Sequence, residues 1–154
     1  MTTVGLISDT HGLMRPEALE ALAGSDLIVH AGDIGSREVV DALERIAPVY
    51  AVRGNTDRGA WADVFPATQL IEIDGLFLYV VHDVSELDID PAAAQCRIVV
   101  YGHSHRPLIA SRHGVLFINP GSAGLRRSHL PAAVARLRIG SGEPEAQIVQ
   151  LRVG

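Results

Sequence analysis

The chain has 154 residues, a formal net charge of −5 and thirteen basic side chains, every one of them arginine. Because it contains no lysine, it lacks the amine that P-loop NTPases, protein kinases, Schiff-base enzymes and Ser-x-x-Lys acylases require. About 150 residues is typical of one domain that buries roughly 68–70% of its unfolded surface without a disulfide or a structural metal. We therefore expect a single domain over residues 1–154.

Cysteine usage and the amino-terminal residues favour a cytoplasmic protein. The single cysteine, Cys96, cannot form an intramolecular disulfide, and residues 1–7 lack the basic and long apolar regions of a signal peptide. No stretch approaches the ~18 apolar residues of a membrane span. The acidic balance, without a basic run, argues against binding to nucleic acid or to anionic lipid.

The first half of the chain alternates β-rich apolar runs with helix-like segments, which is the pattern of βαβ units and a parallel sheet. Pro16 suits a first helical position and Gly24 can end that helix, while Ser36 can cap a second helix. The expected elements are strands over 4–8, 27–30 and 49–52, a helix over 16–23, and a helix from Ser36 to about residue 46.

The second half has an antiparallel character. Asp74-Gly75 suits a two-residue hairpin turn, and further turns are expected at His113-Gly114 and over 140–144. About ten strands are too many for one small sheet, which indicates two stacked mixed sheets with helices outside. The remaining expected elements are strands over 68–73, 76–82, 98–101, 108–112, 115–119, 134–139 and 147–153, and a short helix over 91–96.

Five apolar runs end in residues that can bind a metal. In α/β sheets ligands bind outside the carboxyl ends of the strands, so we expect these residues to converge on one site. Gly32, Gly54 and Gly102 directly precede three of them and allow a sharp turn and a close approach to a bound ion. The seven candidate ligands are Asp9, His11, Asp33, Asn55, His82, His103 and His105.

Seven ligands exceed one tetrahedral site but suit two metals that share a bridging carboxylate and lie about 3.5–4 Å apart. Mixed imidazole and carboxylate ligation favours manganese, iron, nickel, cobalt or zinc over calcium. Two divalent ions against two aspartates leave the cluster positive, which attracts an anion. Hydrolysis of a phosphate ester fits, because the ions polarise phosphoryl oxygens and lower the pKa of a bridging water.

These residues, in this order, resemble the calcineurin-like metallophosphoesterases, whose pattern is D-x-H, G-D, G-N, a lone His and G-H-x-H. The length is similar to that of the compact prokaryotic phosphodiesterase subgroup, which also contains the retromer scaffold subunit. The resemblance implies an α/β fold, a four-layer α-β-β-α sandwich. The matching segments are Asp9-Thr10-His11, Gly32-Asp33, Gly54-Asn55, His82 and Gly102-His103-Ser104-His105.

The resemblance also implies a role for each ligand. Asp33 would bridge two divalent ions, with manganese the expected metal and nickel, iron, zinc and cobalt as alternatives. Asp33, Asn55 and His103 are the candidate catalytic residues. The first ion would be held by Asp9, His11 and His105, and the second by Asn55, His82 and His103.

Two positions depart from the family pattern. Thr56 follows Asn55, where many members carry the histidine that protonates the leaving group, so this proton donor is unassigned and diesters are favoured over monoesters. Asp83 follows His82, where the family usually has glycine. That carboxylate would alter the turn, bind water or repel highly charged monoesters.

Other polar residues have weaker signals. His30 is either a contact to the metal ligands or a hydrogen-bonded core residue, and residues 119–122 either place amides near the site or form a structural turn. His113 and His129 are expected at the surface, and Cys96 as a small buried hydrophobe. Candidates for substrate binding or for supporting the ligands are His30, Asp57, Asp83, Arg53 and Arg106, with Arg126 and Arg127 as further candidate phosphate contacts.

The expected function is hydrolysis of phosphate esters by a two-metal enzyme, with diesters favoured and a small or nucleotide-like substrate. Two alternatives stay open: a non-catalytic protein-interaction scaffold on the same fold, and a phosphomonoesterase or nucleotidase. No membrane partner or stable nucleic-acid complex is expected, whereas a homo-oligomer is compatible with the sequence.

Overall fold

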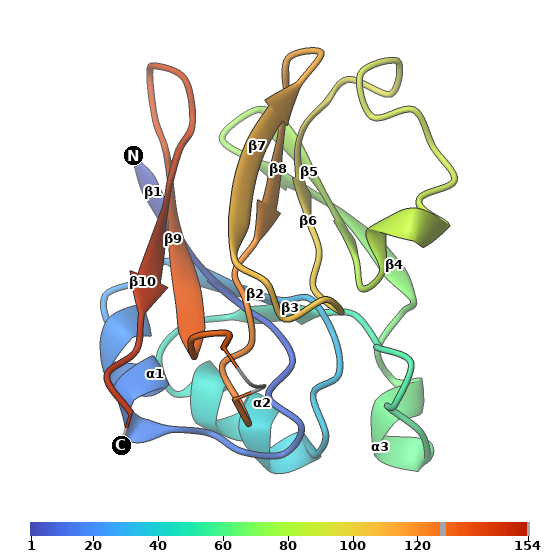
Figure 1. Cartoon of the computed structure of the whole chain (residues 1–154). Helices are drawn as coiled ribbons and strands as arrows, with labels where there is room; N and C mark the ends of the chain where they lie inside the picture. The colour runs from blue at the N-terminus through green and yellow to red at the C-terminus, as the bar shows by residue number, and fades with distance from the viewer. Residues whose placement is uncertain (127–128, 154) are drawn as a thin grey trace.

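Ten strands form two mixed five-stranded sheets in the computed structural model, which describes residues 1–126 and 129–153 (Figure 1). The first sheet has the order β10-β9-β1-β2-β3 and the second β4-β5-β6-β8-β7. The first comprises β1 (Thr2–Ile7), β2 (Leu27–His30), β3 (Val49–Ala51), β9 (Ala133–Ile139) and β10 (Glu145–Gln150). The second comprises β4 (Thr68–Ile73), β5 (Leu76–Val81), β6 (Cys96–Val100), β7 (Leu108–Arg112) and β8 (Val115–Asn119).

Each sheet has a parallel centre and antiparallel margins. Strands β1, β2 and β3 run parallel, as do β5, β6 and β8, whereas β9 and β10 in the first sheet and β4 and β7 in the second pair antiparallel. The carboxyl ends of the parallel strands are where α/β sheets bind ligands. This topology therefore provides two sets of such ends, one from each sheet.

The two sheets pack face to face through side chains that are fully buried. Val4 and Leu6 of β1 belong to the same core cluster as Leu78 and Val80 of β5 and Ile98 of β6. Alternation along each strand sends every second side chain to this inner layer. The predicted pair of stacked mixed sheets is confirmed.

Helices cover the outer face of the first sheet. They are α1 (Pro16–Leu22), α2 (Arg37–Glu44) and the short α3 (Ala60–Asp63), and their apolar side chains join a second buried cluster with Ile7 and Ile28 of the sheet. Among the described residues, the 3₁₀ turn η1 (Val84–Glu86) and Leu87 after it pack against the outer face of the second sheet. The four-layer α/β sandwich is confirmed, with a thin fourth layer.

Most expected elements appear within two residues of their predicted bounds, but the helix predicted over 91–96 is wrong. Residues 91–95 form turns, and Cys96 already pairs with Phe77 in the second sheet. The Asp90 side chain accepts two amides as a helix N-cap would, but Gln95 has a φ of 62°, which a right-handed helix does not tolerate. The alanines are exposed, so no apolar face holds a helix in place.

Both predicted two-residue hairpin turns are confirmed. Asp74 and Gly75 have φ values of 48° and 82°, and His113 and Gly114 have 51° and 78°, the left-handed pairs that a type I′ turn requires. Among the described residues, no helix is long and apolar enough to cross a membrane.

Candidate metal centre

The seven candidate ligands all follow strands of the parallel centres. Asp9 and His11 come after β1, Asp33 after β2 and Asn55 after β3, all in the first sheet. The second sheet contributes the remaining three from the ends of β5 and β6, namely His82, His103 and His105. Residues up to 96 positions apart in the sequence are thereby brought to one edge of the sandwich.

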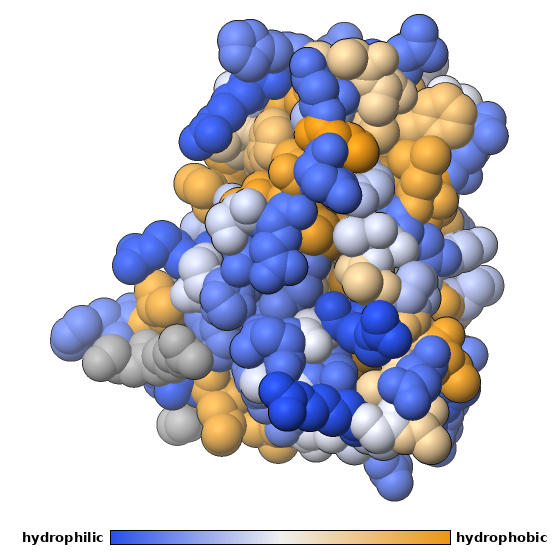
Figure 2. All heavy atoms as spheres, turned by 90° about the vertical axis from the view of Figure 1, so that its right-hand side faces the viewer, coloured by the Kyte–Doolittle hydropathy of each residue, from blue (hydrophilic) through white to orange (hydrophobic). Residues whose placement is uncertain are grey.

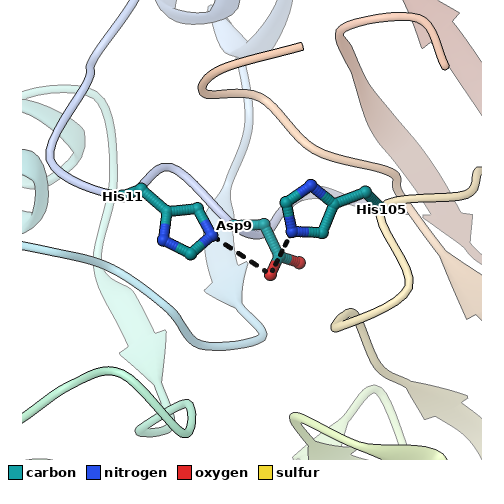
Figure 3. A group of neighbouring side chains, drawn as sticks. All are labelled: Asp9, His11 and His105. Atoms are coloured by element: carbon teal, nitrogen blue, oxygen red, sulfur yellow. Dashed lines mark ion pairs between the residues drawn. The ribbon is translucent and has the colours of Figure 1, made fainter. Parts of the chain in front are cut away.

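Asp9 lies at the centre of the cluster (Figure 3). Its Oδ1 atom is 3.8 Å from Nε2 of His11 and 3.3 Å from Nε2 of His105, and these two rings approach it from opposite sides. Its other oxygen, Oδ2, accepts hydrogen bonds from the Ser8 hydroxyl at 2.7 Å and from the His103 amide at 3.1 Å. These bonds orient the carboxylate so that Oδ1 faces the imidazoles.

Asp33 and His82 form the second half of the cluster. Oδ2 of Asp33 is 3.3 Å from Nε2 of His82 and 3.7 Å from Nε2 of His11, while its Oδ1 accepts the amide of Thr56 at 3.0 Å. Nδ1 of His82 lies 2.7 Å from the carbonyl oxygen of Ala31. Because a carbonyl only accepts, Nδ1 carries the hydrogen, and the neutral ring presents a bare lone pair at Nε2.

Four side-chain atoms in this cluster are buried and have no hydrogen-bond partner: Asp9 Oδ1, His11 Nε2, His82 Nε2 and His105 Nδ1. A buried polar atom without a partner costs about 1–3 kcal/mol, so such atoms are rare in folded proteins and need an explanation. The possible ligand atoms of Asp9, His11 and His105 lie within 4.8 Å of one another, and so do those of Asp9, Asp33 and His82. The donor set fits divalent metal ions, which would satisfy Asp9 Oδ1, His11 Nε2 and His82 Nε2; His105 faces Asp9 through Nε2, the nitrogen opposite its unpartnered Nδ1.

The backbone of the centre is strained. Eight non-glycine residues in the described part of the chain have a positive φ, and only three of them, Asp74, Gln95 and His113, lie outside the ligand set. Such conformations cost of order 1–3 kcal/mol each and persist where the surroundings impose them, most often at functional sites. The five ligands concerned are Asp9 (55°), His11 (46°), Asp33 (53°), His103 (70°) and His105 (63°).

Two of the glycines predicted from the sequence are required by close packing of the loops. A Cβ on Gly54 would lie 2.1 Å from Oδ1 of Asp33, and a Cβ on Gly102 would lie 2.1 Å from the hydroxyl of Ser8 and 2.5 Å from Oδ2 of Asp9. The glycines therefore let the strand ends approach the ligand side chains themselves.

His30 and Asp57 hold the loops behind the ligands. His30 is fully buried; its Nδ1 accepts the amide of Gly32, so Nε2 carries the hydrogen and donates to the hydroxyl of Thr10. Burial lowers the pKa of His30 to about 4, which keeps it neutral. The carboxylate of Asp57 accepts three backbone amides, from residues 34, 35 and 54. Both residues therefore support the loops that carry the candidate ligands.

The segment 119–122 ties the remaining loops together. Nδ2 of Asn119 donates to the carbonyl oxygen of Gly102 and to the hydroxyl of Ser104, and the Ser122 hydroxyl donates to the carbonyl oxygen of Asp9. Of the two interpretations left open by the sequence, these contacts favour the structural one. Ser8 was not predicted to support the site. A small hydroxyl residue directly before Asp9, at the end of an apolar strand, could have indicated a hydrogen bond to that carboxylate.

His103 and Asn55 lie at the rim of the cluster and not among its buried atoms. Both are exposed, and His103 meets the edge of the His82 ring at a centroid distance of 5.2 Å. Nε2 of His103 is 3.7 Å from Oδ2 of Asp83, whose Oδ1 accepts the amide and the hydroxyl of Ser85. The unusual carboxylate after His82 therefore caps η1 and faces a candidate ligand.

The candidate arginines differ in their positions. Arg53 is half-buried and lines a cavity beside Asn55, whereas Arg106 is exposed. Arg126 is exposed at another cavity, and Arg127 lies outside the described residues. His113 and His129 are at the surface and Cys96 is buried, all as predicted.

Charges within the cluster shift its pKa values. Burial alone would raise the pKa of Asp33, but the facing imidazole of His82 and the hydrogen bond from the Thr56 amide outweigh it and hold that pKa well below its usual range. Burial would lower the pKa of His82, yet Asp33 and Asp9 together raise it. A proton at Nε2 of His82 would compete with a metal ion for that atom, so metal binding would release it.

Comparisons of the sequence and of the fold with known proteins point to one family. The model of the calcineurin-like phosphoesterase superfamily domain matches residues 2–142. The chain belongs to this superfamily. A relative over most of its length is a probable metallophosphoesterase of Methanothermobacter thermautotrophicus, 32% identical over 159 residues that cover 96% of this chain and 91% of the relative. Phosphodiesterase YfcE of Escherichia coli is 32% identical over 155 residues, covering 84% of each chain.

Solved structures confirm the calcineurin-like fold. A predicted phosphoesterase from Streptococcus pneumoniae superimposes with a TM-score of 0.77 at 24% identity, covering 97% of this chain and 89% of that one. Vps29 from Chaetomium thermophilum gives a TM-score of 0.79 at 17% identity, covering 98% and 97%. Membership of the family, together with the unpartnered ligand atoms, makes the chain a metal-dependent phosphoesterase.

Proposed function

We propose that this phosphoesterase binds two divalent ions and hydrolyses phosphodiesters of small molecules. The observation that carries the proposal is the set of three unpartnered atoms, Asp9 Oδ1, His11 Nε2 and His82 Nε2, which are distributed over two groups of possible ligands that share Asp9. A single tetrahedral ion would not use all the donors of both groups. The relatives named phosphodiesterase support the choice of diesters.

We assign Asp9, His11 and His105 to one ion, and His82 with the rim residues Asn55 and His103 to the other. Asp33 suits the bridging position, because its Oδ2 lies 3.7 Å from a histidine of the first set and 3.3 Å from a histidine of the second. The exposed positions of Asn55 and His103 suit ligands that border the substrate.

Two bound ions would supply Lewis acidity toward phosphoryl oxygens and a nucleophilic water at neutral pH. The chain's own residues prepare this centre. The hydrogen bond from His82 Nδ1 to Ala31 fixes the tautomer that presents Nε2, and the contacts from Ser8 and the His103 amide fix the carboxylate of Asp9. These groups are held before substrate arrives, so little reorganisation is needed during the reaction.

The residue after Asn55 favours diesters over monoesters. Thr56 offers no imidazole to protonate a leaving group, and its amide is committed to Asp33. Asp83 adds a negative charge near His103, which disfavours a dianionic monoester more than a monoanionic diester. We further propose manganese as the working metal, on the mixed imidazole and carboxylate donors, and the cytoplasm as the compartment, on the free thiol of Cys96.

Turnover of a chromogenic phosphodiester tests the proposal. Protein stripped with EDTA should be inactive, and added manganese should restore hydrolysis of bis-p-nitrophenyl phosphate. Asp33→Ala should lower kcat/KM by more than about 100-fold, since contacts that only support metal ligands are already worth about 10–100-fold. Asp63→Ala, which removes an exposed carboxylate from α3, is the matched control and should retain activity.

Failure of manganese and of nickel, iron, zinc and cobalt to restore turnover would contradict the proposal, as would full activity of Asp33→Ala. Stoichiometric capture of a protein partner by metal-loaded chain that hydrolyses no phosphate ester would favour the scaffold alternative instead. A higher kcat/KM for p-nitrophenyl phosphate than for a diester with the same leaving group would favour a monoesterase.

A further inference from the structure

A cavity of about 330 Å³ lies directly beside the candidate metal centre. Two of its lining residues, Asn55 and His82, are candidate ligands, and the wall that continues from β5 into η1 supplies three carboxylates. These are Asp83, Glu86 and Asp88. Figure 2 views the side of the molecule where η1, β4 and α3 lie, and it shows a band of hydrophilic side chains running down the middle of that face.

His82 joins this cavity to the candidate metal centre. The residue is only 5% exposed and lines the cavity, while its unpartnered Nε2 faces Asp33 and Asp9 of the metal centre. A molecule bound through its phosphoryl group at the metal centre therefore has adjoining space for one of its ester groups. The volume is at the lower end of the usual range for ligand sites, about 300–1,000 Å³, which indicates a small alcohol.

The charge of the cavity is negative and largely uncompensated. Three carboxylates and one guanidinium, that of Arg53, line the cavity, so its lining carries a net charge of −2. In the described part of the chain no ion pair joins Arg53 to any of these carboxylates, and the side chains of Glu86 and Asp88 make no hydrogen bond. Asp83 uses Oδ1 for Ser85 and keeps Oδ2 toward the metal centre.

We propose that this cavity binds one alcohol group of the phosphodiester and selects an alcohol that carries a positive charge, such as an amino or quaternary ammonium alcohol. The inference rests on the proposed phosphodiesterase function and adds a substrate class to it. A cationic group on the ester would lie against the carboxylates while its phosphate lies at the metals. A leaving group that carries further phosphates would be repelled by the same wall.

The expected preference is moderate, because Glu86 and Asp88 are exposed and single exposed charges contribute little. Three like charges on one wall act together, and we expect a preference of about tenfold for a cationic over a neutral ester of the same shape. Water and salt screen this attraction, so the preference should shrink at 1 M salt, where the Debye length is about 3 Å.

Two esters that differ only in charge test the proposal. p-Nitrophenyl phosphocholine carries a trimethylammonium group, and p-nitrophenyl 3,3-dimethylbutyl phosphate has a carbon in place of that nitrogen. The wild type should show a kcat/KM ratio of about ten between them at low salt, falling toward one in high salt. In Glu86→Gln/Asp88→Asn the ratio should fall toward one at low salt as well.

The control variant Glu20→Gln/Glu145→Gln removes the same charge from exposed positions on α1 and β10 and should keep the wild-type ratio. Binding of choline alone, followed by NMR shifts of residues 83–88 with 3,3-dimethylbutanol as the neutral comparison, gives a readout without turnover. A ratio of one in the wild type, a ratio unchanged in the double variant, or no choline-specific shifts would overturn the subsite. Absence of hydrolysis of both esters, with choline binding retained, would instead overturn the proposed function.

Discussion

His30 occupies a position at which a single buried side chain joins two loops that carry candidate ligands. It bridges Thr10, between Asp9 and His11, and Gly32, directly before Asp33. Neither nitrogen is free to bind a metal, because one accepts an amide and the other donates to a hydroxyl. Its role is therefore to position the loops, and that role requires the neutral ring.

The pH dependence of stability should report on this histidine. The pKa of His30 is about 4 in the folded chain and about 6.5 in the unfolded chain, so the unfolded chain binds more protons between these values. Stability that is present above about pH 6.5 should be lost as the pH falls toward 4, by up to about 3 kcal/mol. Urea denaturation of EDTA-treated protein measures this loss. His30→Gln should abolish it, and the exposed-site control His129→Gln should not; an unchanged slope in His30→Gln would contradict the assignment.

Residue types and spacing were sufficient to predict the candidate ligands and to single out His30 and Asp57 as possible supports, but not the contacts that these two residues make. The five candidate ligands at the centre of the cluster could be predicted because each motif follows an apolar strand and carries a donor atom. The contacts of Asp57 with the amides of Ile34 and Gly35 could not be predicted, since these amides lie 23 and 22 residues earlier in the chain. The cavity wall at Glu86 and Asp88 could not be predicted either, although the acidic residues that follow His82 in the sequence could have indicated a negatively charged surface there.

At the scale of elements, the turns that follow the strands can bring the candidate ligands together because these turns pack closely against one another. The turn after β3 lies against the turn after β2, and Gly54 is where they meet. Hairpins could be predicted because the Asp-Gly and His-Gly pairs encode their own turn. The helix over 91–96 could not be excluded from sequence, since Asp90 caps the segment as it would cap a helix, and the segment is ended by the positive φ of Gln95 and by the pairing of Cys96 with Phe77.

Gly54→Ala tests the close packing of these turns. The added Cβ would lie 2.1 Å from Oδ1 of Asp33 and 2.2 Å from its backbone nitrogen, so the turns must separate. We expect a loss of roughly 1–3 kcal/mol in the free energy of unfolding and a weaker affinity for metal. Gly142→Ala is the control, because nothing lies within 4 Å of its added Cβ. Equal stability and metal affinity of the two variants would show that the contact has no such role.

At the scale of the whole molecule, the packing of the two sheets brings together candidate ligands that follow strands of different sheets. The first sheet supplies Asp9, His11 and Asp33, and the second supplies His82 and His105. The number of strands and the two-sheet arrangement could be predicted from the sequence. The order of the strands could not, because β9 returns from far along the chain to pair with β1, and β7 lies outside β8. Such long-range pairing depends on packing of the complete core.

The number of metal ions per chain tests the central claim most directly. Anomalous X-ray diffraction from crystals soaked with manganese, supported by elemental analysis of the same protein, locates and counts the ions. We predict two ions per chain on either side of Asp33, one near Asp9, His11 and His105 and the other near His82. Asp33→Ala should lose at least one of them. A single ion in the wild type, or manganese bound only elsewhere on the surface, would contradict the account.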